Sequence, residues 1–166
     1  MSLPLPGRDT VRTLLLDAGG VLVRPSFDRV ADTLRAQGVA ADPDRLAAAD
    51  AAAKAELDRP PGPGLATDEE RGFQHFNRIL EHAGIVLSAA TDRALLELKR
   101  LHDRQNIWDQ VLPGVRESLA RFRRVGLRLA VVSTANGTVG GLLERLGLLE
   151  AFDAVLDSGV EGIEKP

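Results

Sequence analysis

The sequence has no cysteine, no tyrosine and a single tryptophan, and its 21 Lys and Arg residues are outnumbered by 24 Asp and Glu. Without cysteine, the chain can form no disulfide bond, thiol nucleophile or thiolate metal site. A net charge of −3 provides no basic surface for nucleic acid or an anionic membrane. The apolar runs are far too short to span a bilayer, and residues 1–8 do not have the pattern of a signal peptide. We therefore expect a cytoplasmic protein without nucleic-acid or membrane partners.

The rest of the composition is that of a folded domain. Of 166 residues, 44% are hydrophobic and 27% are charged, which are proportions of a globular chain and not of a disordered one. This length suits one ordinary domain with its own hydrophobic core.

Three short apolar runs predict strands of a parallel sheet. They lie at residues 11–16, 127–132 and 154–156, and each is followed by a polar residue and a turn that contains glycine. Such runs are typical of strands that are buried on both faces and whose carboxyl ends face a site. Helical patterns at 115–126 and 138–146 alternate with the later strands, which indicates an α/β fold with crossover helices.

The stretch from residue 24 to residue 112 shows no strand pattern and predicts helices only. An all-helical insert therefore separates the first strand from the rest of the sheet. The four predicted helices cover residues 26–38, 42–57, 67–83 and 88–101.

Three residues that could carry chemistry follow the three predicted strands. Asp17 precedes two glycines that let a ligand approach the backbone. Ser133 opens a segment whose hydroxyls and free amides, at the start of a helix, could cradle an anion. Lys165, one of three lysines, could neutralise phosphoryl charge. Taken singly, Asp17 could equally be a turn residue, while a helix cap and a surface lysine are the favoured interpretations of Ser133 and Lys165. The carboxyl ends of parallel strands, however, converge on one crevice.

Three segments resemble the motifs of one known family. They are residues 14–22 (Leu-Leu-Leu-Asp-Ala-Gly-Gly-Val-Leu), residues 131–133 (Val-Val-Ser) and residues 162–166 (Gly-Ile-Glu-Lys-Pro). In this order and spacing they are similar to the haloacid dehalogenase (HAD) superfamily of hydrolases with a helical cap. The resemblance implies a Rossmann-like parallel sheet at 1–23 and 113–166, and a cap at 24–112 that closes over the site and selects the substrate.

The same resemblance implies roles for particular residues. Asp17 would be the nucleophile that forms an aspartyl-phosphate, which water then hydrolyses. Ser133 and Lys165 would complete the catalytic set by binding the transferring group and offsetting its charge. The phosphate-binding residues would be Gly20, Ser133, Thr134 and Lys165.

The resemblance also implies a Mg²⁺ ion, held by the carboxylate of Asp17 and the backbone carbonyl of Gly19. Phosphatases of the family usually carry a second Asp at the latter position, as a general acid and base worth about 10²–10⁴-fold in rate. Gly19 keeps the carbonyl but has no proton to give. The leaving group then needs no proton, or another group supplies it, or turnover is slow.

The sheet is expected to be incomplete. The chain ends at Pro166, before the acidic fourth motif that completes the metal site in the family. If the other two strands stack on one side of the first, that first strand becomes an apolar open edge. We therefore expect a fragment of a longer hydrolase, or a shortened product whose edge a partner or a second copy covers.

Three functions follow from these observations. The leading one is a Mg²⁺-dependent phosphatase that acts on a small phosphorylated molecule. The absent acid at Gly19 leaves open a hydrolase of the 2-haloacid dehalogenase type. The absent acidic motif leaves open a catalytically incompetent chain that serves only as a binding module.

The remaining candidates have simpler interpretations. His75, His82 and His102 fall on predicted helices of the insert without a third ligand at zinc-site spacing. Trp108, where the chain returns from the insert, is expected to be a packing anchor.

Overall fold

The computed structural model describes residues 11–57 and 68–163, which form parts of two compact units. One unit comprises Met1–Pro25 and Trp108–Pro166, and the other comprises Ser26–Ile107. The chain therefore leaves the first unit after Pro25 and returns to it at Trp108, where the sequence had placed these boundaries at residues 23 and 113.

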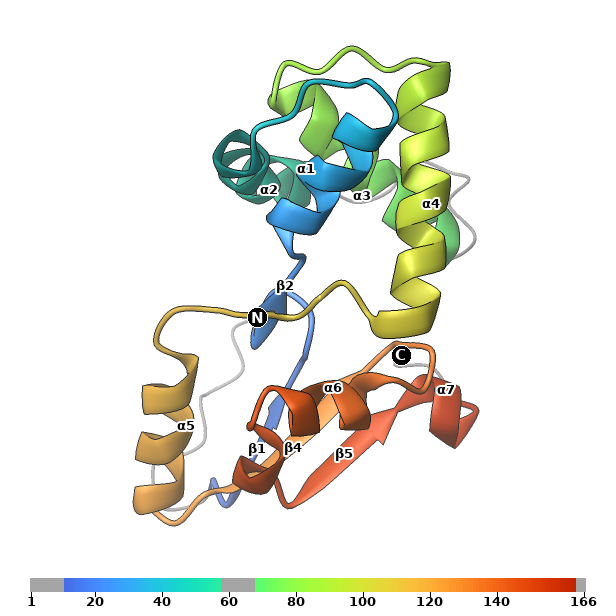
Figure 1. The fold of residues 1–166 in the computed structure, drawn as a ribbon. Helices are drawn as coiled ribbons and strands as arrows, with labels where there is room; N and C mark the ends of the chain where they lie inside the picture. Colours follow the sequence, from blue (N-terminus) through green and yellow to red (C-terminus); the bar gives the residue numbers. More distant parts are fainter. Residues whose placement is uncertain (1–10, 58–67, 164–166) are drawn as a thin grey trace, which may run out of the picture. The chain divides into compact units, whose positions relative to one another are not determined.

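A three-stranded parallel sheet forms the first unit, which confirms the predicted α/β class. The strands are β1 (Thr13–Leu16), β4 (Arg128–Ser133) and β5 (Ala154–Asp157), in the order β1-β4-β5 (Figure 1). Within the described residues β1 pairs only with β4, so it is an edge strand of the sheet that these residues form, as expected.

Helices α5 (Val115–Arg124) and α6 (Val139–Arg145) supply the apolar side chains that pack on the sheet. Burial of a leucine-sized side chain stabilises a fold by about 1.5–3 kcal/mol, so this layer dominates the stability of the unit. A 3₁₀ turn (Leu149–Ala151) and the short helix α7 (Ser158–Glu161) flank β5. The most deeply buried side chains of this core are Val23, Leu129, Val131, Leu142 and Leu143.

The prediction that all three strands are buried on both faces is wrong for β1 and β5. Leu15 and Leu156 are 64% and 43% exposed. Side chains alternate between the faces of a strand, and the register places these two on the same face, opposite the partly buried Leu16 and Val155. The side chains of the described helices pack only on the face that carries Leu16 and Val155.

The expectation that residues 24–112 contain no strand is also wrong. The two-residue strands β2 (Val23–Arg24) and β3 (Gln110–Val111) pair antiparallel, and the Arg24 side chain donates to Gln110 Oε1 over 3.2 Å. Two residues cannot show a periodic pattern, so sequence reasoning had no signal for this ribbon.

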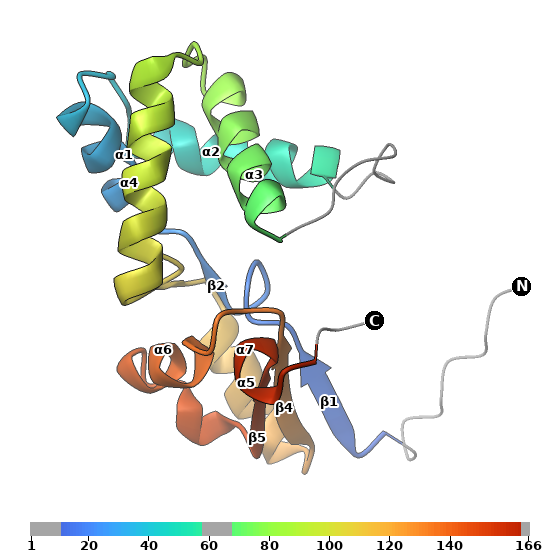
Figure 2. The same ribbon diagram turned by 90° about the vertical axis from the view of Figure 1, so that its right-hand side faces the viewer.

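Four helices form the second unit, as predicted: α1 (Phe27–Ala36), α2 (Pro43–Leu57), α3 (Asp68–His82) and α4 (Ala89–Gln105). Helix α1 packs on α4, and α2 packs on α3 (Figure 2). Ser88 and Thr91 form a capping box at the start of α4, whereas the capping box predicted at Thr67 lies outside the described residues. None of the helices in the described part of the chain is both long and apolar enough to cross a membrane.

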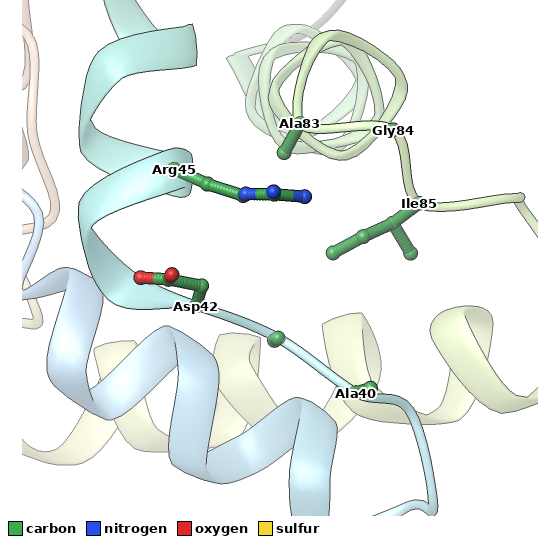
Figure 3. Close-up of a pocket in the computed structure, with 7 residues that line it drawn as sticks. Ala40, Asp42, Arg45, Ala83, Gly84 and Ile85 are labelled. Atoms are coloured by element: carbon green, nitrogen blue, oxygen red, sulfur yellow. The ribbon is translucent and has the colours of Figure 1, made fainter.

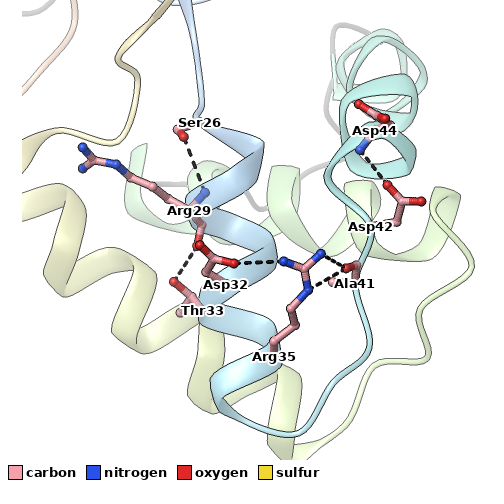
Figure 4. Close-up of polar contacts among 8 residues, drawn as sticks. All are labelled: Ser26, Arg29, Asp32, Thr33, Arg35, Ala41, Asp42 and Asp44. Carbon is pink, nitrogen blue, oxygen red and sulfur yellow. Dashed lines mark hydrogen bonds and ion pairs between the residues drawn. The ribbon is translucent and has the colours of Figure 1, made fainter.

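Polar contacts fix the path from α1 to α2 (Figure 4). Ser26 caps α1 by accepting the amide of Arg29, and Arg35 joins Asp32 on its own helix to the carbonyl of Ala41. Asp42 then accepts the amide of Asp44 at the start of α2. The contacts of Arg35 and Asp42 are exposed, so they fix the connection more than they stabilise the unit.

Candidate active site

The polar residues that follow the strands lie at one edge of the sheet. Asp17 comes directly after β1, and Ser133 and Asp157 are the last residues of β4 and β5. Leu16 pairs with Val131, and Ser133 pairs with Asp157. Because neighbouring strands are about 4.8 Å apart, the structure places Asp17 and Ser133 on adjacent strand ends of the same unit.

A tight turn holds the segment that follows Asp17. The carboxylate of Asp17 is exposed, and its Oδ1 accepts the amide of Ala18 over 2.7 Å. Gly20 has φ of 73°, a left-handed conformation that favours glycine, and its amide donates to Val23 O over 2.7 Å. Among the described residues no hydrogen bond ends on the carbonyl of Gly19, which therefore stays available to a ligand.

The indole of Trp108 covers Gly19. A methyl group added at Gly19 would lie 3.4 Å from Cζ3 and 3.6 Å from Cε3 of this ring, which is ordinary van der Waals contact. Position 19 thus carries no acid and faces an apolar surface. Sequence reasoning treated Trp108 as a packing anchor and missed its place beside Gly19, because a contact between residues so distant in the chain leaves no local pattern.

Ser133 is only 6% exposed, and its hydroxyl makes no hydrogen bond within the described part of the chain. Thr134, the next residue, is half-buried. A hydroxyl without a protein partner at this sheet edge can donate to an oxygen of a bound anion.

The amides that follow Ser133 are not all free, which corrects the expectation of an open anion cradle. Ala135 N donates to Ser158 Oγ over 2.9 Å. Gly137 N and Val139 N each donate over 3.0 Å to Asp157, one to each carboxylate oxygen. The protein itself therefore satisfies three amides that the sequence had suggested for a ligand.

Sequence reasoning gave Asp157 no role, although the structure makes it the most heavily bonded carboxylate at this edge. It is 3% exposed and also accepts the amide of Gly159 over 3.0 Å. Its signal in the sequence, an Asp that ends a strand before Ser-Gly, was the same kind of signal that singled out Asp17.

Lys165 lies outside the described residues, so the structure brings together Asp17, Gly19, Gly20, Ser133 and Thr134 but does not place the lysine. No group of three or more His, Asp or Glu side chains that could hold a metal occurs among the residues whose side chains the structure describes. The carboxylate of Asp17 and the free carbonyl of Gly19 are nevertheless oxygen donors of the kind that Mg²⁺ takes. It usually binds one or two protein carboxylates and completes its coordination with waters and phosphate oxygens. The residues present fit such an ion.

Two histidines of the second unit join α3 to α2. His75 Nε2 lies 3.0 Å from Asp50 Oδ1, and His82 Nε2 lies 3.2 Å from Glu56 Oε1. Burial lowers the pKa of the third, His102 in α4, and this effect exceeds the opposing charge of Asp103.

A cavity of about 360 Å³ opens on the second unit, between the start of α2 and the loop that follows α3 (Figure 3). The side chain of Arg45 points into it, toward Ile85. It contains none of the residues predicted to carry chemistry.

Comparison with known proteins identifies what the chain is similar to. A family model described as haloacid dehalogenase-like hydrolase matches residues 11–166. Haloacid dehalogenase-like hydrolase domain-containing protein 3 of Bos taurus is 31% identical over 163 residues. This match covers 94% of the chain but only 64% of the bovine protein, so the chain spans less than two thirds of that relative's length.

Solved structures share the fold. The HAD-hydrolase YfnB of Bacillus subtilis, bound to magnesium, matches with a TM-score of 0.57 and 19% identity over 94% of this chain and 67% of YfnB. A predicted phosphoglycolate phosphatase from Haemophilus somnus matches with a TM-score of 0.52 and 18% identity over 96% of this chain and 68% of that one.

Proposed function

Given that this chain belongs to the haloacid dehalogenase-like hydrolase family, we propose that it acts as a Mg²⁺-dependent phosphatase on a small phosphorylated molecule. One observation carries the proposal: the exposed carboxylate of Asp17 lies on the strand end next to Ser133, whose hydroxyl has no hydrogen-bond partner among the described residues. A nucleophile beside an oxygen-binding donor is the minimum that phosphoryl transfer requires.

The reaction would proceed in two displacement steps at phosphorus. A carboxylate oxygen of Asp17 attacks phosphorus, and the bond from phosphorus to the leaving oxygen breaks with its electron pair on that oxygen. Water then attacks the phosphorus of the aspartyl-phosphate, which restores the carboxylate and releases phosphate. Ser133 and Thr134 donate hydrogen bonds to the phosphoryl oxygens, together with the charge of Lys165.

The turn after Asp17 is suited to two further tasks. Gly20, without a side chain, lets the phosphoryl group approach the backbone. The carboxylate of Asp17 and the carbonyl of Gly19 would hold Mg²⁺, which when bound supplies positive charge against the phosphoryl oxygens.

Hydrolysis of a carbon–halogen bond is a second candidate, which the lack of an acid at Gly19 favours. Halide departs without a proton, so Asp17 could displace it beside the indole of Trp108. Halide release from a 2-haloacid without added metal supports this candidate, and no release across a panel of 2-haloacids removes it.

The third candidate is a chain that binds a partner without catalysis. It is favoured because the described residues contain no group of three or more acidic or His side chains that could hold a metal ion, at Asp17 or elsewhere. Turnover together with Mg²⁺ binding by the 166-residue chain excludes it.

The test is hydrolysis of p-nitrophenyl phosphate with Mg²⁺ and with a chelator. We expect Asp17→Asn to lower kcat by at least about 10³-fold, because the amide is a poor nucleophile. Asp92→Asn, the same change at an exposed carboxylate in the first turn of α4, is the matched control and should retain the wild-type rate. Equal rates in wild type and Asp17→Asn would show that the nucleophile is wrongly assigned.

A further inference from the structure

The carboxylate of Asp157 holds two segments of the chain together. Its Oδ1 accepts the amides of Gly137 and Gly159, and its Oδ2 accepts the amide of Val139, each over 3.0 Å. The side chain is almost fully buried, so no water competes for these bonds. Three amides share the two carboxylate oxygens, so an Asn side chain, which has only one oxygen, leaves at least one of these donors without an acceptor.

Ser158 and Gly159 extend this contact. The hydroxyl of Ser158 accepts the amide of Ala135 over 2.9 Å and donates to the carbonyl of the same residue over 3.1 Å. Gly159 packs so closely on the backbone of residues 135–137 that no side chain fits between them. We call residues 157–159 the clamp turn.

We infer that the clamp turn positions Ser133 and Thr134 for binding of a phosphoryl group, with Asp157 as its principal residue. The segment that the turn holds, residues 135–139, begins directly after these two hydroxyls. The clamp turn also begins the chain that leads to Lys165, so one carboxylate fixes the start of both segments. This inference rests on the proposed phosphatase function and adds a positioning residue to it.

A purely structural role would give different results. Asp153, at the other end of β5, is a natural comparison because its carboxylate also accepts a backbone amide, that of Leu129 over 2.8 Å, and pairs with Arg123 over 2.6 Å. Its hydrogen bonds lie at the amino ends of β4 and β5, and none of them reaches the loop after Ser133. Asp153→Asn therefore controls for loss of stability without loss of the clamp.

The experiment compares Asp157→Asn with Asp153→Asn in the 166-residue chain. Amide hydrogen exchange at Gly137 and Val139 reports the clamp, calorimetric titration with inorganic phosphate in the presence of Mg²⁺ reports oxygen binding, and p-nitrophenyl phosphate gives kcat and KM. We expect Asp157→Asn to speed exchange by about 10- to 100-fold and to weaken phosphate binding and raise KM by about 10-fold. Asp153→Asn should leave all three within about twofold. Ser158→Ala, which removes only the bonds to Ala135, serves if Asp157→Asn does not fold and should show the same changes in smaller degree.

The outcomes are distinguishable. Faster exchange with unchanged phosphate affinity and KM overturns the positioning role and leaves the phosphatase proposal intact. Equal effects of the two Asn variants show a structural role and overturn the inference. A wild-type chain that neither binds phosphate nor turns over overturns the proposed function, and with it the positioning role, while the exchange data still show whether the clamp exists.

Discussion

A single methyl group at Gly159 should disrupt the candidate site without touching any of its polar side chains. A Cβ at this position would overlap the backbone nitrogen of Gly137 and would lie 2.6 Å from the carbonyl carbon of Asn136 and 2.8 Å from the carbonyl oxygen of Ala135. All three atoms are backbone, so no side chain can turn aside. Ordinary contact begins near 3.5 Å, and the loop must therefore retreat by about 1 Å.

The magnitude follows from two effects. Overpacking of this kind costs about 1–3 kcal/mol, and the displaced loop weakens the bonds to Asp157 and Ser158 by a further 1–3 kcal/mol. We expect Gly159→Ala to lower the free energy of unfolding by about 3 kcal/mol. Gly140→Ala is the control, because this glycine lies in α6 with open space around it, and alanine there should stabilise by about 0.5–1 kcal/mol.

Urea unfolding followed by the emission of Trp108 is the assay. This residue is the only tryptophan in the chain and lies in the same unit as both glycines. The dependence of the unfolding free energy on urea concentration should stay constant. The urea concentration at the unfolding midpoint should fall for Gly159→Ala and rise for Gly140→Ala. If the free energy of unfolding of Gly159→Ala lies within about 0.5 kcal/mol of the wild-type value, the predicted steric conflict is refuted, because the clamp turn then accommodates the methyl group without destabilising the fold.

Three further predictions concern the turn after Asp17 and the far end of β5. Because Trp108 covers Gly19, saturation with Mg²⁺ should change the fluorescence emission of Trp108. If calorimetry shows that the ion binds but the emission does not change, Gly19 is not a ligand. Because position 19 has no proton to give, kcat/KM for a series of aryl phosphates should fall steeply as the pKa of the leaving phenol rises, and a flat dependence would reveal a donor elsewhere. The amide of Leu129, helped by Arg123, lowers the pKa of Asp153, so this carboxyl stabilises the fold above its unfolded pKa and the effect is lost as pH falls below about 4. Unfolding midpoints of wild type and Asp153→Asn should converge on acidification, and a constant difference would contradict this.

The sequence predicts the elements whose signal is local. The apolar runs before Asp17, Ser133 and Asp157 became three strands, and the capping serines at 26 and 88 begin two of the four helices of the second unit. The family motifs also placed the candidate nucleophile and hydroxyl, because such residues must follow a strand. Burial was predicted less well, since a run such as 13–16 does not show which face a helix will cover.

Contacts between distant segments were the part that could not be predicted. The bonds from Asp157 to Gly137 and Val139 join residues 20 and 18 positions apart across two strand ends. The contact of Trp108 with Gly19 joins the two chain segments that flank the helical unit. Neither leaves a periodic or composition signal, because tertiary packing alone decides which amide meets which carboxylate.

Gly20 and Gly159, which lie at the carboxyl end of the sheet, are required for different physical reasons that the residue type alone does not reveal. Gly20 is required for its backbone, since φ of 73° strains any residue with a Cβ. Gly159 is required for its missing side chain, since it has no such φ but meets the backbone of residues 135–137. Alanine at position 20 should therefore strain the turn that follows Asp17. Alanine at position 159 should move the loop that follows Ser133 and begins at Thr134, and through this loop the hydroxyls proposed to bind the phosphoryl group.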